Sequence, residues 1–416
     1  MSQLHKKFSD DQVRAIMHNY HEGQMTRQHA QELLEVGKSR FFTLLQQYRA
    51  NPASMSLEYQ RKAIQRINSE TDQIIRQELK REKDLVEDKR LPISSYNYTA
   101  LRDRLKQKGI TVSVPTIIKR AIEENCCQPR RKQKTHDRMV VTSAIGEMIQ
   151  HDASVHLWSP LASEKWTLIT SLDDYSRILL FADFFAHETS WAHIQAAQTL
   201  LVKHGLPVRY YVGNLRVFRF IQKRDSFWRN HVLETDDADP QWRQIMRLLK
   251  VGVTYALSPQ AKGKIERPFR WLQDRIVRTC ALESISSCEE ARLVLQAEVE
   301  RYNYHQVHST TGEIPAIRFE RAKTSGNSLF RPFYLPKPYS SLKDVFCLHA
   351  TRTLNGYRKV SLGGMEIEIP KVPIREDVDI HLIPLDAASV EIRIWYENKM
   401  VHTLTLPSRK FPGVHF

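Results

Sequence analysis

The order of strand and helix patterns in the middle of the chain constrains the fold most. Three apolar, strand-like segments come first, and helical and strand-like segments then alternate. Three consecutive strands followed by such alternation predict a mixed α/β layer fold. The predicted strands are about 147–157, 165–173, 177–185, VRYYVG and VGVTYALS, and the predicted helices are SWAHIQAAQTLLVKHG, about 240–250 and about 261–281.

The flanking segments have a different character. Helical patterns precede the α/β block, and short strands separated by turn signals follow it, which predicts a multidomain chain ending in a small β-barrel or an open sheet. The predicted domains are a helix-turn-helix (1–52), a helical connector (53–90), a second helix-turn-helix, plain or winged (91–125), a basic linker (126–140), the α/β core (141–325) and a β-rich domain (326–416).

The N-terminal pattern indicates DNA binding. Ser9 or Asp10 suits the N-cap of a first helix, and two short helices follow around the turn at Gly37. In a helix-turn-helix, Lys38, Ser39 and Arg40 would begin the recognition helix and meet DNA. A plain three-helix bundle is the alternative interpretation. In the second helical pair, Ser113 is a reasonable N-cap, and a short strand is expected between its helices.

The charge of the chain points to a polyanionic partner. The net charge is +15 and the pI is about 9.5, which favours double-stranded DNA. In the linker, Arg130, Arg131 and Lys132 would contact its phosphates. Alternatively, the linker is only a solvent-exposed tether. The absence of a run of 18 apolar residues argues against a membrane span. Five scattered cysteines without metal-type spacing suit a reducing cytoplasm. We expect a cytoplasmic protein that is associated with the nucleoid.

An aspartate in the first predicted strand is a candidate for chemistry. Period-two alternation puts Gln150, Asp152, Ser154 and His156 on one face of EMIQHDASVHLW. A carboxylate inside a central strand costs desolvation energy unless it is paired or binds a metal. An N-cap or an exposed place on an edge strand is the alternative.

A glutamate near the start of the long helix is the second candidate. Glu266 lies in SPQAKGKIERPFRWLQ among several cations, as a salt-bridged surface residue or as a metal ligand beside a phosphate site. The cations that would contact DNA phosphates there are Lys262, Lys264, Arg267 and Arg270.

Four passages together resemble the retroviral-integrase superfamily, the ribonuclease H-like enzymes that include many insertion-sequence transposases. They are QHDAS, TLITSLDDYSRILLFADF, SPQAKGKIERPFRWLQ and YNYHQVHSTTGEIPAIRF. They span about 146–320 and resemble the first-strand aspartate, the D-x-x-S-R hairpin, the Pro-x-x-x-Gly-x-x-Glu-Arg helix and the Tyr-Asn tail of that family. The resemblance implies a ribonuclease H-like core that cleaves DNA and transfers strands.

The resemblance also implies a metal site with three carboxylates. Two Mg²⁺ (or Mn²⁺) ions, about 3.5–4 Å apart, serve in-line displacement at phosphorus. Asp152 matches the first ligand and Glu266 the third, but the second aligns with Gly213. The family further implies a homo-multimer on the element's terminal repeats and target DNA, with or without a helper ATPase.

Three interpretations of Gly213 stay open. The chain has lost the aspartate, by decay or by design, and cleaves poorly. Alternatively, an acid from the predicted insertion 223–242, one of Asp225, Asp236 and Asp237, replaces it. In the third interpretation, Asp173 or Asp174 contributes, although the family uses that hairpin aspartate structurally.

Three classes of function follow. The first is a transposase, the second a non-catalytic, transposase-derived DNA-binding protein or repressor, and the third a nuclease that uses the same core. Gly213 favours the second class, whereas the retained Asp152, Glu266 and flanking domains favour the first.

Overall fold

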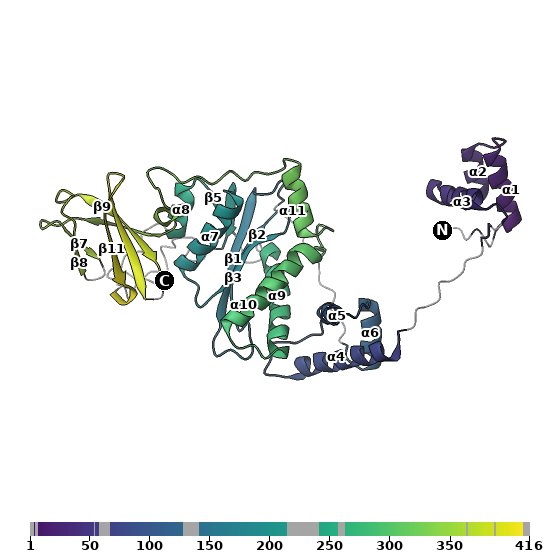
Figure 1. Ribbon diagram of the computed structural model, residues 1–416, viewed down its shortest axis with the longest axis horizontal. Coiled ribbons are helices and arrows are strands. Elements are labelled where there is room, and N and C mark those ends of the chain that lie inside the picture. Colours follow the sequence, from purple (N-terminus) through teal and green to yellow (C-terminus); the bar gives the residue numbers. More distant parts are fainter. Residues whose placement is uncertain are drawn as a thin grey trace. The chain divides into compact units, whose positions relative to one another are not determined.

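The computed structural model describes residues 4, 7–53, 55–57, 67–127, 141–213, 241–256, 263–362, 365–386 and 388–410. Figure 1 labels their helices and strands. The chain divides into two compact units, Met1–Asp72 and Gln73–Phe416. Within the described ranges, no helix combines the length and the apolar character that crossing a membrane requires.

Three helices form the first unit, as the sequence predicts: α1 (Asp10–His21), α2 (Arg27–Leu34) and α3 (Lys38–Ala50). Ser9 is the N-cap of α1, and it forms a capping box with Gln12 that satisfies backbone donors at both positions. The apolar faces of the helices meet in one core that includes Met17, Leu34 and Phe41, all fully buried.

A second group of helices comprises α4 (Ser69–Glu87), α5 (Tyr98–Gln107) and α6 (Val114–Glu123). Ser113 caps α6 as predicted, accepting a hydrogen bond from the Thr116 backbone N–H (3.3 Å). The short strand predicted between α5 and α6 was wrong, because 110–113 is irregular and no strand is described between 91 and 127. A lone segment has no neighbour to satisfy a strand's backbone groups.

The five predicted strands of the core form one mixed sheet. They are β1 (Met148–His156), β2 (Trp166–Asp173), β3 (Leu179–Phe185), β4 (Arg209–Val212) and β5 (Gly252–Tyr255). The order is β3-β2-β1-β4-β5, in which β2 pairs antiparallel with β1 and with β3, while β4 pairs parallel with β1 and with β5. This arrangement confirms the predicted mixed α/β layer.

Helices cover both faces of this sheet (Figure 1). On one face, Ile169 packs with Ala192 and Ala196 of α7 (Ser190–His204). On the other face, Leu168 lies in a cluster with α9 (Gly263–Leu282) and α10 (Cys288–Glu300). Alternation along the strands therefore directs neighbouring residues into two separate cores.

The segment after α10 fastens the helices to the edge of the sheet. A π-helical turn (Arg301–His305) precedes α11 (Pro315–Thr324). The side chain of Asn303 accepts from the Leu179 N–H and donates to the Leu179 carbonyl, both at 2.9 Å. The asparagine of the Tyr-Asn passage is therefore a structural anchor for β3.

The C-terminal strands form an open sheet. The short helix α12 (Leu342–Val345) precedes β6 (Leu348–Thr353), β7 (Lys359–Leu362), β8 (Met365–Glu368), β9 (Asp377–Pro384), β10 (Ser389–Tyr396) and β11 (Lys399–Pro407), and a 3₁₀ turn (Ser408–Lys410) follows them. The sheet order is β11-β10-β9-β6, and β7 pairs with β8 alone. The predicted closed barrel is not found among the described strands, since β6 and β11 remain edges.

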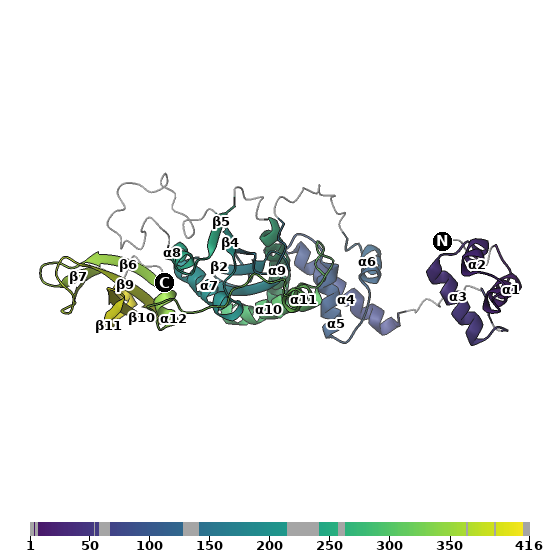
Figure 2. The ribbon, with the colours of Figure 1, turned by 90° about the horizontal axis from the view of Figure 1, so that it is seen from above.

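Helix α8 (Gln241–Leu248) joins the C-terminal sheet to the core (Figure 2). Trp242, Ile245 and Met246 of α8 lie in the same buried cluster as Ile380 and Ile392 of the C-terminal sheet. The same cluster includes Val360, Leu362 and Ile367 of β7 and β8, so elements outside the four-stranded sheet help to bury its apolar residues and the sheet need not close on itself.

Candidate active site

Asp152 is a buried carboxylate on the central strand. It is 8% exposed and lies opposite Thr170 of β2. His156, on the same face by strand alternation, accepts a hydrogen bond at Nε2 from the Gln273 side chain of α9 (2.8 Å). The face of β1 that carries Asp152 is therefore the one that α9 covers.

Gly213 lies level with Asp152 on the neighbouring strand. The parallel register pairs Ile149 with Tyr210 and Gln150 with Tyr211. Continued along both strands, this register brings Gly213, the residue directly after β4, opposite Asp152. Gly213 is buried, so the position that would add a second carboxylate holds no side chain at all.

The beginning of α9 is tied to the same face of the sheet. Lys264 forms an ion pair with Asp174 (Nζ to Oδ2, 2.7 Å), and the Gln150 side chain donates to Asp174 Oδ1 (2.5 Å). Gln150 is two residues before Asp152 on the same face. Glu266 follows Lys264 by two residues in the first turn of α9 and is exposed.

Asp173 and Asp174, at the end of β2, both have structural hydrogen-bond or ion-pair partners. Both backbone and hydroxyl of Ser176 donate to Asp173 Oδ2 (2.8 and 2.6 Å), which closes the D-x-x-S-R turn. Burial raises the pKa of Asp173, although these hydrogen bonds act to lower it. Asp174 is fully buried and pairs with Arg177 as well as with Lys264. These contacts agree with the structural role expected for the hairpin aspartate.

The donors present suit one hard divalent cation better than two. Mg²⁺ is commonly held by one or two carboxylates and keeps several waters, which Asp152 and Glu266 can provide for. A two-ion site needs a further carboxylate, and Gly213 supplies none. Asp174 could serve only by giving up its ion pairs with Lys264 and Arg177. Among the described residues, no group of three acids forms there.

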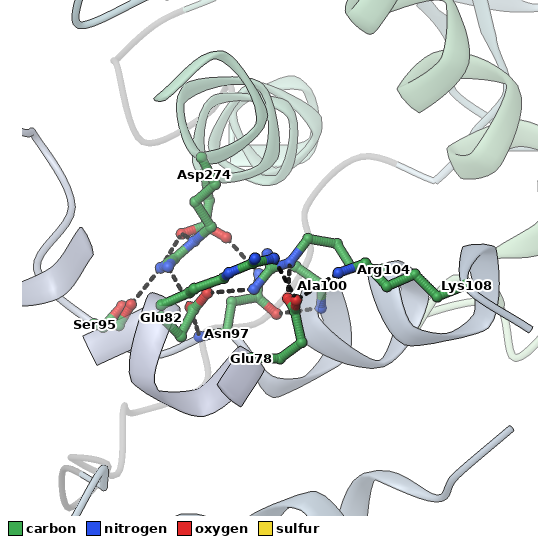
Figure 3. A network of polar contacts seen from close by, with 10 residues as sticks. Glu78, Glu82, Ser95, Asn97, Ala100, Arg104, Lys108 and Asp274 are labelled. Atoms are coloured by element: carbon green, nitrogen blue, oxygen red, sulfur yellow. Dashed lines mark hydrogen bonds and ion pairs between the residues drawn. The ribbon is translucent and has the colours of Figure 1, made fainter. Parts of the chain in front are cut away.

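The other side of α9 holds the helical pair α4–α5 (Figure 3). Arg278 of α9 forms an ion pair with Glu82 of α4 and donates to the Ser95 carbonyl. Glu82 also accepts from Arg104 of α5 (2.7 Å) and from the Asn97 backbone N–H (3.1 Å). Glu82 and Arg278 are almost fully buried, so this network holds α9 against α4 and α5.

The predicted DNA-contacting residues differ in their surroundings. Lys38, Ser39 and Arg40 are exposed in the first turn of α3. Arg267 and Arg270 are exposed on α9, where Arg267 donates to Thr310 Oγ1 (3.0 Å). Lys264 instead neutralises Asp174. The remaining predicted residues, Arg130, Arg131, Lys132, Lys262, Asp225, Asp236 and Asp237, lie outside the described residues.

Sequence reasoning missed the group formed by Gln150, Asp174 and Lys264. The three residues come from β1, the hairpin after β2 and the first turn of α9. A partial signal existed, because Gln150 shares the face of Asp152, and Lys264 shares the first turn with Glu266. Nothing in the linear pattern pairs Lys264 with an aspartate 90 positions earlier.

This sheet order, with an aspartate in the middle of the first strand faced by a helix that carries a glutamate, is the arrangement expected of the ribonuclease H-like class. No family model matches the chain. In sequence it is similar to y4bF of Sinorhizobium fredii, whose name describes it as a transposase (27% identity over 245 residues, 59% of this chain and 49% of that protein). It is also similar to the transposase for insertion sequence IS1202 of Streptococcus pneumoniae (29% over 171 residues, 41% and 35%).

These matches confirm the resemblance to insertion-sequence transposases. The chain spans about half or less of the length of these curated relatives. Solved structures that it matches include a simian T-cell lymphotropic virus intasome in complex with the PP2A regulatory subunit B56 gamma (TM-score 0.35, 13% identity, 72% of this chain and 95% of that one). Another is the catalytic core of HTLV-2 integrase in complex with magnesium (TM-score 0.31, 13%, 42% and 96%).

Proposed function

We propose that the chain is a DNA transposase of the integrase-like type whose metal site lacks one ligand. The observation that carries the proposal is the register of β1 and β4, which, when continued beyond Gln150 and Tyr211, brings Gly213 level with Asp152 on the face that α9 covers. The relatives named above are transposases, and they support the same class of substrate.

Asp152 and Glu266 would hold the cation. When bound, Mg²⁺ supplies Lewis-acid stabilisation of the charge that develops during displacement at phosphorus. Lys264 and Gln150 both bond Asp174, which ties the start of α9 to β1. Glu266 shares a helix face with Gln273, which bonds His156 on the face of Asp152, and would meet Asp152 from that face. Arg267 and Arg270, exposed on α9, would contact the DNA backbone.

The first unit would bind DNA as a helix-turn-helix. Its exposed Lys38, Ser39 and Arg40 stand at the start of α3, the end from which recognition helices contact bases and phosphates. The proposed substrates are the terminal repeats of the element and a target duplex. The active form would be a homo-multimer, because two ends must be joined to one target.

The test compares the unchanged chain with Gly213→Asp in a strand-transfer and nicking assay. The substrates are duplex oligonucleotides that carry the element's terminal repeats, with Mg²⁺ or Mn²⁺. We expect Gly213→Asp to raise activity by about 10³-fold or more, because residues that act as a unit lose most of their effect when one is missing. Gly213→Asn, nearly isosteric but uncharged, should stay at the level of the unchanged chain.

A second candidate function is favoured by Gly213 itself. A transposase-derived protein without strand transfer could bind the element ends as a repressor. Specific binding of the ends with no activity in Gly213→Asp would establish this second function and contradict the first. Equal activity of the unchanged chain and Gly213→Asp would instead show that another carboxylate completes the site.

A further inference from the structure

Three metal-ligating side chains meet in the C-terminal sheet, away from the candidate active site. Cys347 directly precedes β6, and His349 is the second residue of β6. His381 on β9 pairs directly with His349 across the antiparallel ladder. Residues two apart on a strand share a face, and residues directly opposite are neighbours on that face. The local fold therefore brings one thiol and two imidazoles together.

The three groups lie close together, and one distance between them matches that within a metal coordination shell. One ligand atom of each residue lies within 4.8 Å of those of the other two. The Cys347 Sγ to His349 Nε2 distance is 3.5 Å. A tetrahedral ion with a sulfur at about 2.3 Å and a nitrogen at about 2.0–2.1 Å separates those two ligand atoms by about 3.5 Å.

One nitrogen of the cluster lacks a hydrogen-bond partner. His381 is 1% exposed, and its Nδ1 is buried without such a partner in the described part of the chain. An unsatisfied buried polar atom costs about 1–3 kcal/mol, and a bound ion is one common explanation for it.

The surroundings hold the ligands in place. The Gln241 side chain of α8 donates to the His349 carbonyl (2.8 Å) and accepts from the His349 N–H. Trp395 stacks on His381, with ring centroids 5.8 Å apart. Asp344 Oδ1 lies 3.8 Å from His381 Nδ1, and both oxygens of Asp344 accept from Arg393.

We propose that Cys347, His349 and His381 bind a Zn²⁺ ion that ties β6 to β9. Thiolate and imidazole ligands select zinc over the hard cations suited to the acidic site. His349 is partly exposed, so a water molecule can occupy the fourth position from its side. The ion would crosslink the C-terminal sheet next to its contact with α8, which is a structural role independent of the function proposed above.

The first test measures zinc in the full chain after any affinity tag has been cleaved. The protein is stripped with a chelator, dialysed against Zn²⁺ and analysed by mass spectrometry. We expect about one zinc per chain, and a lower Tm after stripping. Substitution by Co²⁺ should give a sulfur-to-cobalt charge-transfer band together with the visible absorption of tetrahedral cobalt. A folded chain that takes up no zinc and shows no such band would overturn the proposal.

The second test assigns the ligands. Cys347→Ser and His381→Gln should lose the cobalt band and most of the zinc. Cys288→Ser, which changes a partly buried cysteine in α10, should keep both. Circular dichroism checks that each variant is folded. If a variant does not fold, the cobalt spectrum of the unchanged chain still decides whether a thiolate is bound. Retention of the band in folded Cys347→Ser would contradict the assignment.

Discussion

Gly213, the residue directly after β4, falls opposite Asp152 when the parallel register of β1 and β4 is continued beyond Gln150 and Tyr211. Register partners in a sheet point their side chains to the same face, so a side chain at position 213 would lie beside the Asp152 carboxylate. The missing group is therefore the side chain of a single buried residue.

Gly213→Asp should strengthen binding of divalent cations. Adding a carboxylate next to Asp152 provides a further hard oxygen ligand, and we expect the affinity for Mn²⁺ to rise by at least roughly tenfold, or about 1.4 kcal/mol. Calorimetric titration of the DNA-free protein measures this without any reaction. Gly213→Asn is the control, and equal affinities of the two variants would show that position 213 does not face the ion.

Arg278→Met should loosen the helical pair α4–α5 from α9. The substitution leaves Glu82 fully buried with less compensation, which costs about 3–5 kcal/mol for a buried pair. Hydrogen exchange should show faster exchange in α4 and α5 than in the sheet. Lys83→Met, which removes an exposed pair with Glu87, should cost less than about 0.5 kcal/mol. Equal effects of the two substitutions would contradict a role for the buried network.

Lys38→Ala and Arg40→Ala should weaken DNA binding by the first unit. If each contacts a phosphate, the slope of log K against log salt should fall by about 0.9 for each residue removed. Fluorescence anisotropy at several salt concentrations measures the slope. Arg49→Ala at the other end of α3 is the matched control. An unchanged slope in the first two variants would argue for a plain helical bundle.

Stability should decrease on acidification through His204. Burial lowers the pKa of His204 to about 4, from 6.5, and Lys203 and Lys323 add to the shift. As the pH falls, His204 is therefore protonated in the unfolded chain at a higher pH than in the folded chain. The free energy of unfolding consequently decreases as the pH falls from 6.5 towards 4. We expect about 2 kcal/mol, after allowance for partial exposure. Chemical denaturation at pH 7 and pH 4.5 should show a smaller loss in His204→Gln than in His187→Gln, an exposed control.

The order of elements in the core was predictable from the sequence. Strands with continuous apolar runs, such as TLITSLD, carry their own signal, and capping residues such as Ser9 and Ser113 mark helix starts. The place of Gly213 followed from the family resemblance alone, and the offset between Asp152 and Gly213 equals that between the paired residues Met148 and Arg209.

Contacts between distant segments were not predictable. Lys264 pairs with Asp174 because a helix start and a hairpin meet in space, which spacing alone does not encode. The cysteines show no metal-type spacing in sequence, yet Cys347 meets His381 because β6 pairs with β9. The open C-terminal sheet has the same origin, since its apolar residues share a core with α8 and with the β7–β8 pair, which are distant in sequence.

The shared core of α8 and the C-terminal sheet limits how this chain can be recombined. The strand-rich end looks like a detachable module, but Trp242 and Ile245 are buried together with Ile380. Gln241 of α8 also bonds the backbone of His349 in β6, so grafting this sheet onto a related protein without α8 would divide a shared buried cluster and break both hydrogen bonds. The segment that has to be moved as one piece is therefore larger than the stretch of sequence that resembles a domain.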